Sequence, residues 1–206
     1  MLDPRQLLSY AWVYSLFRRL VTGKKENRYL KEFLRIVPGQ RVLDIGCGPA
    51  DLLADFPVGV DYHGYDHEPD YIASAKARYG DRGTFRVHAV TPDAVDDIGT
   101  FDVVIATAVL HHLTDEEAGT LLAGAAKVLR PGGRLVTLDG AYVEGQAWLA
   151  RLLLKLDRGR FVRTPDAYLA LARRHFGHVE ATVVHDLIAI PYTHIILEAA
   201  DPLPSL

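Results

Sequence analysis

A glycine-rich segment and a later aspartate carry the strongest chemical signal in this 206-residue chain. The segment reads Asp44-Ile-Gly-Cys-Gly-Pro-Ala50 and follows a short apolar stretch that predicts a β-strand. Its glycines let the backbone approach a ligand closely, and the helix expected after it offers free amide groups. Asp66, 20 residues after Gly46, is expected at the end of the next strand. A carboxylate there can accept two hydrogen bonds from ribose hydroxyls.

These features indicate a cofactor that contains a nucleoside, and both NAD and S-adenosylmethionine fit them. The dinucleotide-binding motif requires Gly or Ala at its third glycine position, which is Asp51 when counted from Gly46. A carboxylate that faces a pyrophosphate is repelled by it, so an NAD-dependent oxidoreductase is disfavoured.

Two adjacent histidines, His111 and His112, follow the fourth expected strand. A free imidazole titrates at about pH 6.5, so either ring suits a general base near neutral pH. The structural alternative is that one ring packs beneath a cofactor while the other caps or hydrogen-bonds the loop. We expect His111 to be the base if the reaction requires one.

The composition excludes several classes of protein. With 23 Lys and Arg against 26 Asp and Glu, the net charge of -3 lacks the excess of cations that nucleic-acid binding requires. Cys47 is the one cysteine and the nine histidines are scattered, so neither a disulfide nor a metal site is expected. No apolar stretch approaches the roughly 20 residues that span a bilayer, and the N-terminus lacks a signal-peptide pattern. A cytoplasmic protein is expected.

The elements that would position these residues alternate along the chain. Strands are expected over 41–45, 60–65, 84–90, 101–107, 134–138, 179–184 and 194–199. Helices are expected over 8–20, 30–37, 51–55, 69–79, 114–130, 147–156 and 164–176.

The last two strands are separated by about ten residues without a helical pattern. Parallel neighbours need a crossover of a dozen or more residues, so this pair is expected to be antiparallel. Two helix starts carry capping signals, a Thr114 to Glu117 capping box and a Thr164-Pro165 start. The whole pattern predicts a single-domain α/β fold, an open sheet of seven strands with helices on both faces and an antiparallel last strand.

The chain resembles the class I S-adenosylmethionine-dependent methyltransferases from about residue 28 to residue 200. The segments that carry the resemblance are Val42-Leu-Asp-Ile-Gly-Cys-Gly-Pro-Ala50, Gly64-Tyr-Asp66, Phe101-Asp-Val-Val, Val109-Leu-His-His-Leu113 and Leu129-Arg-Pro-Gly-Gly133. The resemblance implies a Rossmann-like core over residues 28–200, with residues 1–27 as a helical lid.

The resemblance also implies the residues that hold S-adenosylmethionine. They are Asp44, Gly46, Cys47, Gly48, Asp66, His67, Asp93, Ala94 and Thr107. The glycines would line the methionine part with Asp44 near its amino group, Asp66 would hold the ribose, and Asp93-Ala94 would face the adenine. For Asp93, a solvated carboxylate in an acidic loop is an equal alternative.

One position departs from the family motif, because Ala50 stands where its last glycine is expected. If this position requires a positive φ, Ala50 strains the turn and weakens cofactor binding.

The reaction implied is methyl transfer to an oxygen, nitrogen or carbon atom of a small-molecule acceptor, with release of S-adenosylhomocysteine. The chain lacks the Asn/Asp-Pro-Pro-aromatic signature of enzymes that methylate base amines, which together with the acidic pI argues against a nucleic-acid substrate. Two alternatives stay open: a membrane-peripheral quinone or lipid methyltransferase, because the His-His pair resembles ubiquinone-pathway enzymes, and a noncatalytic cofactor-binding module. The oligomeric state also stays open.

Two groups of basic residues flank the expected core. They are Arg18, Arg19, Lys24, Lys25 and Arg28, and then Arg151, Lys155, Arg158, Arg160 and Arg163. Such runs are most often a solvated face. If they border the acceptor site, they favour an anionic small molecule or a lipid headgroup.

Overall fold

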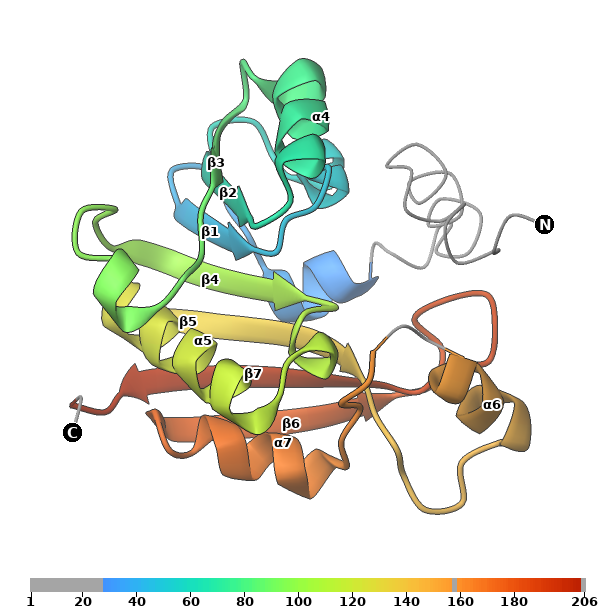
Figure 1. Ribbon diagram of the computed structural model, residues 1–206. Coiled ribbons are helices and arrows are strands. Elements are labelled where there is room, and N and C mark those ends of the chain that lie inside the picture. The colour runs from blue at the N-terminus through green and yellow to red at the C-terminus, as the bar shows by residue number, and fades with distance from the viewer. Residues whose placement is uncertain (1–27, 157–158, 205–206) are drawn as a thin grey trace.

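The computed structural model describes residues 28–156 and 159–204 (Figure 1). The strands are β1 (Arg41–Ile45), β2 (Asp61–Asp66), β3 (Gly83–Val87), β4 (Phe101–Thr107), β5 (Leu129–Gly140), β6 (Phe176–Val184) and β7 (His194–Pro202). The longer helices are α4 (Pro69–Tyr79), α5 (Asp115–Val128), α6 (Trp148–Leu156) and α7 (Pro165–Ala172). Short helical turns are η2 (Tyr29–Leu34), η3 (Asp51–Asp55), η4 (Pro92–Ala94) and η5 (Leu110–His112). The helix expected over 8–20 and the lid expected over 1–27 lie outside the described residues.

The strands form one sheet in the order β3-β2-β1-β4-β5-β7-β6. Strands β1 to β5 run parallel to one another, whereas β7 runs antiparallel to both β5 and β6. The predicted seven-stranded sheet with an antiparallel last strand is therefore confirmed. The strand order reverses between β1 and β4, and the carboxyl ends of strands at such a switch point form the usual ligand crevice of open α/β sheets.

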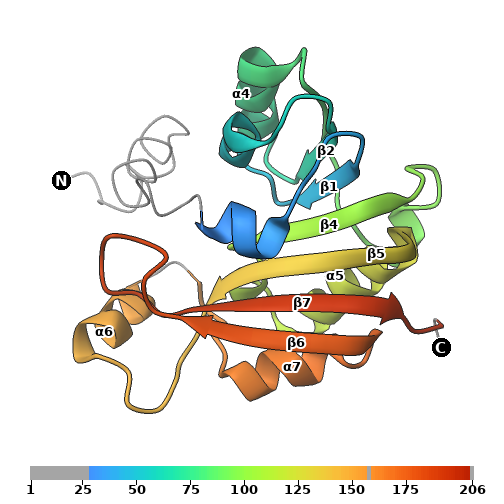
Figure 2. The same cartoon turned by 180° about the vertical axis from the view of Figure 1, so that it is seen from behind.

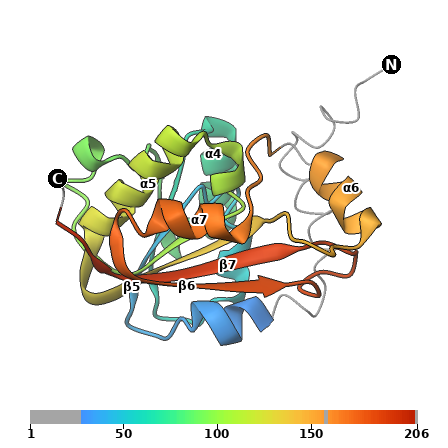
Figure 3. The ribbon, with the colours of Figure 1, turned by 90° about the horizontal axis from the view of Figure 1, so that it is seen from below.

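Alternating side chains of the strands divide the core into two halves. In β4, Val103 and Ile105 pack with η2, η3 and α4, whereas Val104 and Ala106 pack with α5 and α7. Because successive side chains of a strand point to opposite faces, one apolar strand supplies both halves. Figure 3 shows α5 and α7 on one face of the sheet and η2 on the opposite face. In Figure 2, which views the molecule from behind, η2 lies in front of the sheet. Helices on both faces are confirmed.

Both predicted helix starts are confirmed. The Thr114 side chain accepts a hydrogen bond from the Glu117 amide, and the Glu117 side chain accepts one from the Thr114 amide. The Thr164 hydroxyl accepts from the amide of Ala167, with Pro165 at the first helical position.

Several predicted boundaries are wrong: β3 ends at Val87 rather than residue 90, β6 begins at Phe176 rather than Val179, and β7 ends at Pro202 rather than Ala199. Tertiary pairing explains two further differences. Helix α7 ends at Ala172 rather than near Phe176, because Phe176 is the buried first residue of β6 and pairs with Pro202. Strand β5 begins at Leu129 rather than Arg134, because Leu129 already pairs with Phe101 before the register shifts.

Candidate cofactor and acceptor site

The loop between β1 and η3 turns through three residues with left-handed backbone. Gly46, Gly48 and Ala50 have φ of 69°, 55° and 57°. The Gly46 amide donates to the Tyr65 carbonyl at 2.7 Å, which ties the loop to the end of β2. Ala50 therefore has the positive φ at which an alanine is strained. A left-handed backbone costs a non-glycine residue about 1 to 2 kcal/mol.

Asp66 joins this loop to the segment that leads into α4. Its side chain is only 6% exposed, and one carboxylate oxygen accepts from the Gly48 amide at 2.8 Å. The other oxygen accepts from the Glu68 amide at 2.9 Å. Each carboxylate oxygen has a second lone pair, so Asp66 can still accept from two ribose hydroxyls. The next residue, His67, is exposed, with its Nδ1 3.4 Å from the Asp66 carboxylate.

Asp44 and Cys47 lie close to Asp66. Asp44 is buried and accepts a hydrogen bond from the Tyr62 hydroxyl at 2.6 Å. Burial, followed by the charge of Asp44, raises the pKa of Tyr62 well above its usual value, so Tyr62 remains the donor. Burial also raises the pKa of the Cys47 thiol, and the charges of Asp44 and Asp66 raise it further. Cys47 is therefore a protonated turn residue and does not supply a thiolate nucleophile.

The end of β4 lies against the glycine-rich loop. A Cβ atom at Gly46 would lie 2.6 Å from Cγ2 of Val109, so the two segments are in direct contact. The Thr107 hydroxyl is 3.2 Å from the hydroxyl of Tyr29, which comes from η2. The structure thus brings Asp44, Gly46, Gly48, Asp66 and Thr107 to one edge of the sheet.

The predicted adenine-edge residues lie in η4. Asp93 is exposed and Ala94 is half-buried. The Ala94 carbonyl lies 2.7 Å from Nε2 of His88, and the His88 ring packs edge-on against Tyr65. The segment is therefore connected to the loop through Tyr65, while the role of Asp93 in adenine binding stays a prediction.

His111 and His112 lie in η5, directly after β4. His111 is 3% exposed, and its Nδ1 is 2.7 Å from the carboxylate of Asp139 near the end of β5. His112 is exposed, and the centroids of the two rings are 4.2 Å apart. Asp139 is not among the site residues that the sequence motifs indicate. Its place at the end of a predicted strand, the position where ligands bind in this fold, is the signal that could have found it.

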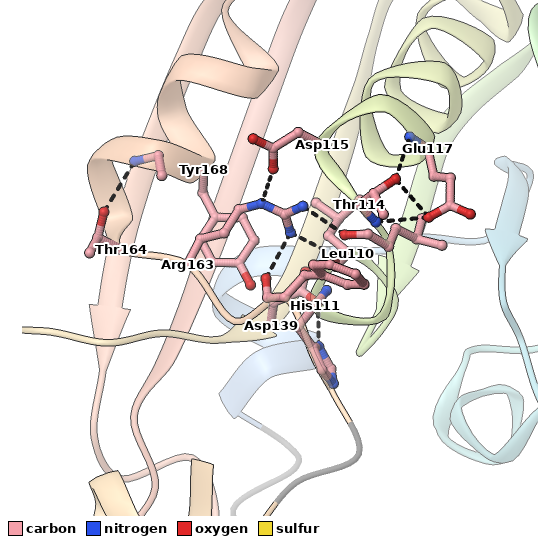
Figure 4. A network of polar contacts seen from close by, with 12 residues as sticks. Leu110, His111, Thr114, Asp115, Glu117, Asp139, Arg163, Thr164 and Tyr168 are labelled. Atoms are coloured by element: carbon pink, nitrogen blue, oxygen red, sulfur yellow. Dashed lines mark hydrogen bonds and ion pairs between the residues drawn. The ribbon is translucent and has the colours of Figure 1, made fainter. Parts of the chain in front are cut away.

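Arg163 is the exception to the solvated face expected for the second basic group, because Arg151, Lys155 and Arg160 are exposed but Arg163 is buried. Its side chain is 7% exposed and donates to the Asp115 carboxylate at 2.8 Å and to the carbonyls of Leu110 and Leu113 at 2.8 and 2.6 Å (Figure 4). The Phe161 amide also donates to the His111 carbonyl at 3.0 Å. Arg163 therefore anchors the chain before α7 to the turn that carries His111, and does not face an anionic acceptor.

Within residues 28–156 and 159–204, no group of three His, Cys, Asp or Glu side chains is arranged to hold a metal ion. In the same part of the chain, no helix is both long and apolar enough to cross a membrane.

A mixed sheet with an antiparallel β7, a glycine-rich loop after β1 and an acidic residue after β2 define the class of nucleoside-binding α/β proteins to which methyltransferases belong. Residues 43–135 match the family model described as a methyltransferase domain. The chain is 32% identical over 136 residues to an uncharacterized methyltransferase of Synechocystis sp., a match that covers 63% of each protein. It is 36% identical over 106 residues to a ubiquinone biosynthesis O-methyltransferase of Bradyrhizobium sp., covering 50% of this chain and 41% of the relative.

Among solved structures, the fold is similar to phosphoethanolamine N-methyltransferase 2 of Haemonchus contortus, solved in complex with phosphomonomethylethanolamine and S-adenosylhomocysteine. The TM-score is 0.73 at 16% identity, over 96% of this chain and 59% of that one. The chain is thus similar in sequence to methyltransferases over residues 43–135 and similar in fold to a methyltransferase of known structure. It spans less than two thirds of the length of these curated relatives.

Proposed function

We propose that this protein transfers the methyl group of S-adenosylmethionine to a small-molecule acceptor and releases S-adenosylhomocysteine. The observation that carries the proposal is the hydrogen bond from the Gly48 amide to Asp66, because it holds the glycine-rich loop and the ribose-binding carboxylate in one unit. Nucleoside-binding α/β folds use this combination at the ends of their first two strands.

The chain's own residues then have the following roles. Gly46, Cys47 and Gly48 present backbone to the methionine part of the cofactor, and Asp44 accepts from its amino group. Thr107 contributes backbone to the same pocket. The pairs Asp66-His67 and Asp93-Ala94 hold the ribose and the adenine. Methyl transfer from a sulfonium is an in-line displacement, so these contacts accelerate it mainly by orientation.

The histidines act on the acceptor side of the site. His111, or alternatively His112, accepts a proton if the acceptor must lose one. Arg160 is exposed on the chain segment that is bonded to η5 and supplies positive charge for an anionic acceptor.

Isothermal titration with S-adenosylhomocysteine tests the proposal. We expect micromolar binding by the wild type and at least a tenfold weaker Kd in Asp66→Ala, because hydrogen bonds to a charged acceptor contribute about 1.5 to 3 kcal/mol each. Asp81→Ala removes an exposed carboxylate between α4 and β3 and serves as the matched control. Absence of binding by the folded wild type would overturn the cofactor assignment, and equal Kd values in both variants would overturn the role of Asp66.

A second candidate function, methylation of a lipid or quinone at a membrane surface, is favoured by one face of α6. Trp148, Leu152 and Leu156 recur every four residues and are 76%, 42% and 61% exposed; we call them the α6 stripe. Arg151 and Lys155 are exposed beside it. An apolar stripe flanked by cations is typical of a helix that lies in the interface of an anionic bilayer.

Vesicle co-sedimentation separates the two candidates. A lipid or quinone methyltransferase should co-sediment with vesicles of phosphatidylglycerol and phosphatidylcholine, and much less with phosphatidylcholine alone, because Arg151 and Lys155 are attracted to anionic lipid. An enzyme that acts on a small molecule in solution should bind neither kind of vesicle. Trp148→Ser with Leu152→Ser should remove most of the binding. The control Val58→Ser with Val87→Ser changes two exposed apolar residues outside the stripe and should leave it intact. Equal binding by both double variants would exclude the α6 stripe as a membrane surface.

A further inference from the structure

Ala50 has a strained backbone at the last position of the glycine-rich motif. Its φ is 57°, in the left-handed region that favours glycine, and its side chain is buried in the half of the core that contains Ile72 and Ala75 of α4. For a non-glycine residue the cost of this conformation corresponds to a factor of about 5 to 30 in an equilibrium constant. Contacts elsewhere in the folded protein must therefore hold Ala50 at positive φ.

The two neighbours of Ala50 are both held by one side chain of α4. Nη1 of Arg78 donates to the Pro49 carbonyl at 3.2 Å and lies 2.6 Å from the carboxylate of Asp51. One guanidinium group thus contacts the residue before Ala50 and the residue after it. The Ala50 amide donates within the loop, to the Cys47 carbonyl at 3.0 Å, so this bond does not connect the turn to a neighbouring element.

The ion pair between Asp51 and Arg78 differs from an ordinary surface pair. Exposed pairs contribute little to stability, whereas a buried carboxylate requires a partner. Asp51 is buried, and the Arg78 guanidinium is fixed further by Tyr79, to whose hydroxyl Nη2 donates at 2.9 Å. The guanidinium carbon also lies 4.8 Å from the centroid of the Tyr79 ring. The pair is therefore in place before any cofactor binds.

Both ends of α4 are connected to the glycine-rich loop. At the start of the helix, Asp66 accepts from the Gly48 amide and from the amide of Glu68, the residue that precedes the first turn. Arg78 lies in the last turn. The same helix thus fixes Gly48, which is expected to face the cofactor, and the strained Ala50 two residues later.

We infer that Arg78 and Asp51 are positioning residues for S-adenosylmethionine, because their ion pair holds Ala50 at positive φ and keeps the glycine-rich loop in the conformation that binds the cofactor. The inference rests on the proposed binding of S-adenosylmethionine by this loop. Neither side chain needs to touch the cofactor. When the binding-competent conformation is only partly populated, the apparent affinity falls by the same fraction. Loss of the ion pair should therefore weaken cofactor binding by up to the factor that the strain represents.

Titration calorimetry with S-adenosylhomocysteine on the full-length protein tests the inference. The double variant Asp51→Asn with Arg78→Met removes the ion pair without leaving a buried carboxylate unpaired. We expect its Kd to be about 5 to 30 times that of the wild type. Adding Ala50→Gly should return the Kd to within about twofold of the wild type, because glycine adopts this backbone without strain. A merely structural ion pair would not give this rescue.

Arg82→Met is the matched control. Arg82 follows α4, is half-buried and donates to the Phe56 carbonyl at 3.0 Å, beyond η3 rather than in the glycine-rich loop. Its replacement should lower the stability of the protein but leave the Kd within about twofold of the wild-type value. Far-UV circular dichroism at the temperature of the titration establishes that each variant is folded.

Hydrogen exchange of the proteins without ligand gives a second readout. The Ala50 amide and the Leu53 amide, which donates to the Ala50 carbonyl at 3.1 Å, report on the turn directly. Without the ion pair the turn opens more often, so these amides should exchange about 5 to 30 times faster in the double variant than in the wild type. In Arg82→Met their exchange should be unchanged.

A folded double variant that binds S-adenosylhomocysteine as tightly as the wild type would overturn the inference. An equal loss with and without Ala50→Gly would also overturn it, because the ion pair would then act independently of the strain. The same loss in Arg82→Met would indicate general destabilisation and contradict the inference as well.

If the double variant does not fold, the same comparison with Asp51→Asn alone decides. A smaller loss that Ala50→Gly restores supports the inference, and an unchanged Kd overturns it. Failure of the proposed function is recognised separately, because the wild type would then not bind S-adenosylhomocysteine in the calorimeter.

Discussion

Replacing Arg163 with methionine should lower the free energy of unfolding by about 3 to 5 kcal/mol. Methionine fills a similar volume but leaves the carbonyls of Leu113 and Phe161 without the guanidinium donor, while the Leu110 carbonyl keeps only the Leu113 amide at 3.2 Å. Each buried polar group left unpaired costs about 1 to 3 kcal/mol. Asp115 loses its partner at little cost because its side chain is 75% exposed. Urea denaturation followed by circular dichroism measures the difference.

Arg160→Met is the matched control, because Arg160 is an exposed cation three residues earlier in the same connecting segment. Exposed substitutions of this kind change stability by about 0.5 kcal/mol or less. If both variants unfold at the same urea concentration, Arg163 does not anchor the turn that carries His111. A destabilised Arg163→Met variant should also lose turnover, because η5 and His111 are held by the same network.

Gly46→Ala should lower the free energy of unfolding by about 2 to 4 kcal/mol and weaken S-adenosylhomocysteine binding at least tenfold. The first part of the loss is backbone strain of about 1 to 2 kcal/mol, because φ is 69° at this residue. The second part is steric, because the new Cβ would lie 2.6 Å from Cγ2 of Val109. Overpacking of this kind costs about 1 to 3 kcal/mol.

Gly132→Ala separates the backbone strain from the steric overlap as causes of the lost stability. Gly132 has φ of 77°, and a Cβ atom there would meet nothing within 4 Å, so only the backbone strain applies. Thermal and urea denaturation of both variants, together with titration calorimetry, give the comparison. Val109→Ala in the Gly46→Ala background should recover the steric part of the loss. Equal losses at Gly46 and Gly132 would mean that β4 does not pack against the glycine-rich loop.

Local patterns in the sequence determined most of the framework. The predicted bounds of α4 and β4 match the structure, and the capping box at Thr114 forms as expected. These features depend on residues close in the chain: a cap and the helix that follows it, or a strand with apolar side chains for both faces. The antiparallel β7 followed from the short connection before it, which is also a local property.

The sequence also indicated which strand ends carry the chemistry, since Asp44, Gly46, Asp66 and His111 each follow or end a predicted strand. It could not indicate the partner of each group. Gly48 lies 18 residues from Asp66, and His111 lies 28 residues from Asp139. Contacts at such separations depend on the order in which strands pair, which no local pattern encodes.

The burial of Arg163 is the feature that the sequence predicted least well. Its charge, within a run of basic residues, favoured a solvated position, yet its guanidinium is buried against carbonyls about 50 residues earlier in the chain. A buried cation is stable only when its donors meet acceptors at hydrogen-bonding distance. The sequence by itself determined the sheet, its class and the strand ends that bear the cofactor residues. Tertiary structure alone decided which charges are buried and paired, because desolvation and hydrogen bonding depend on neighbours that folding brings together.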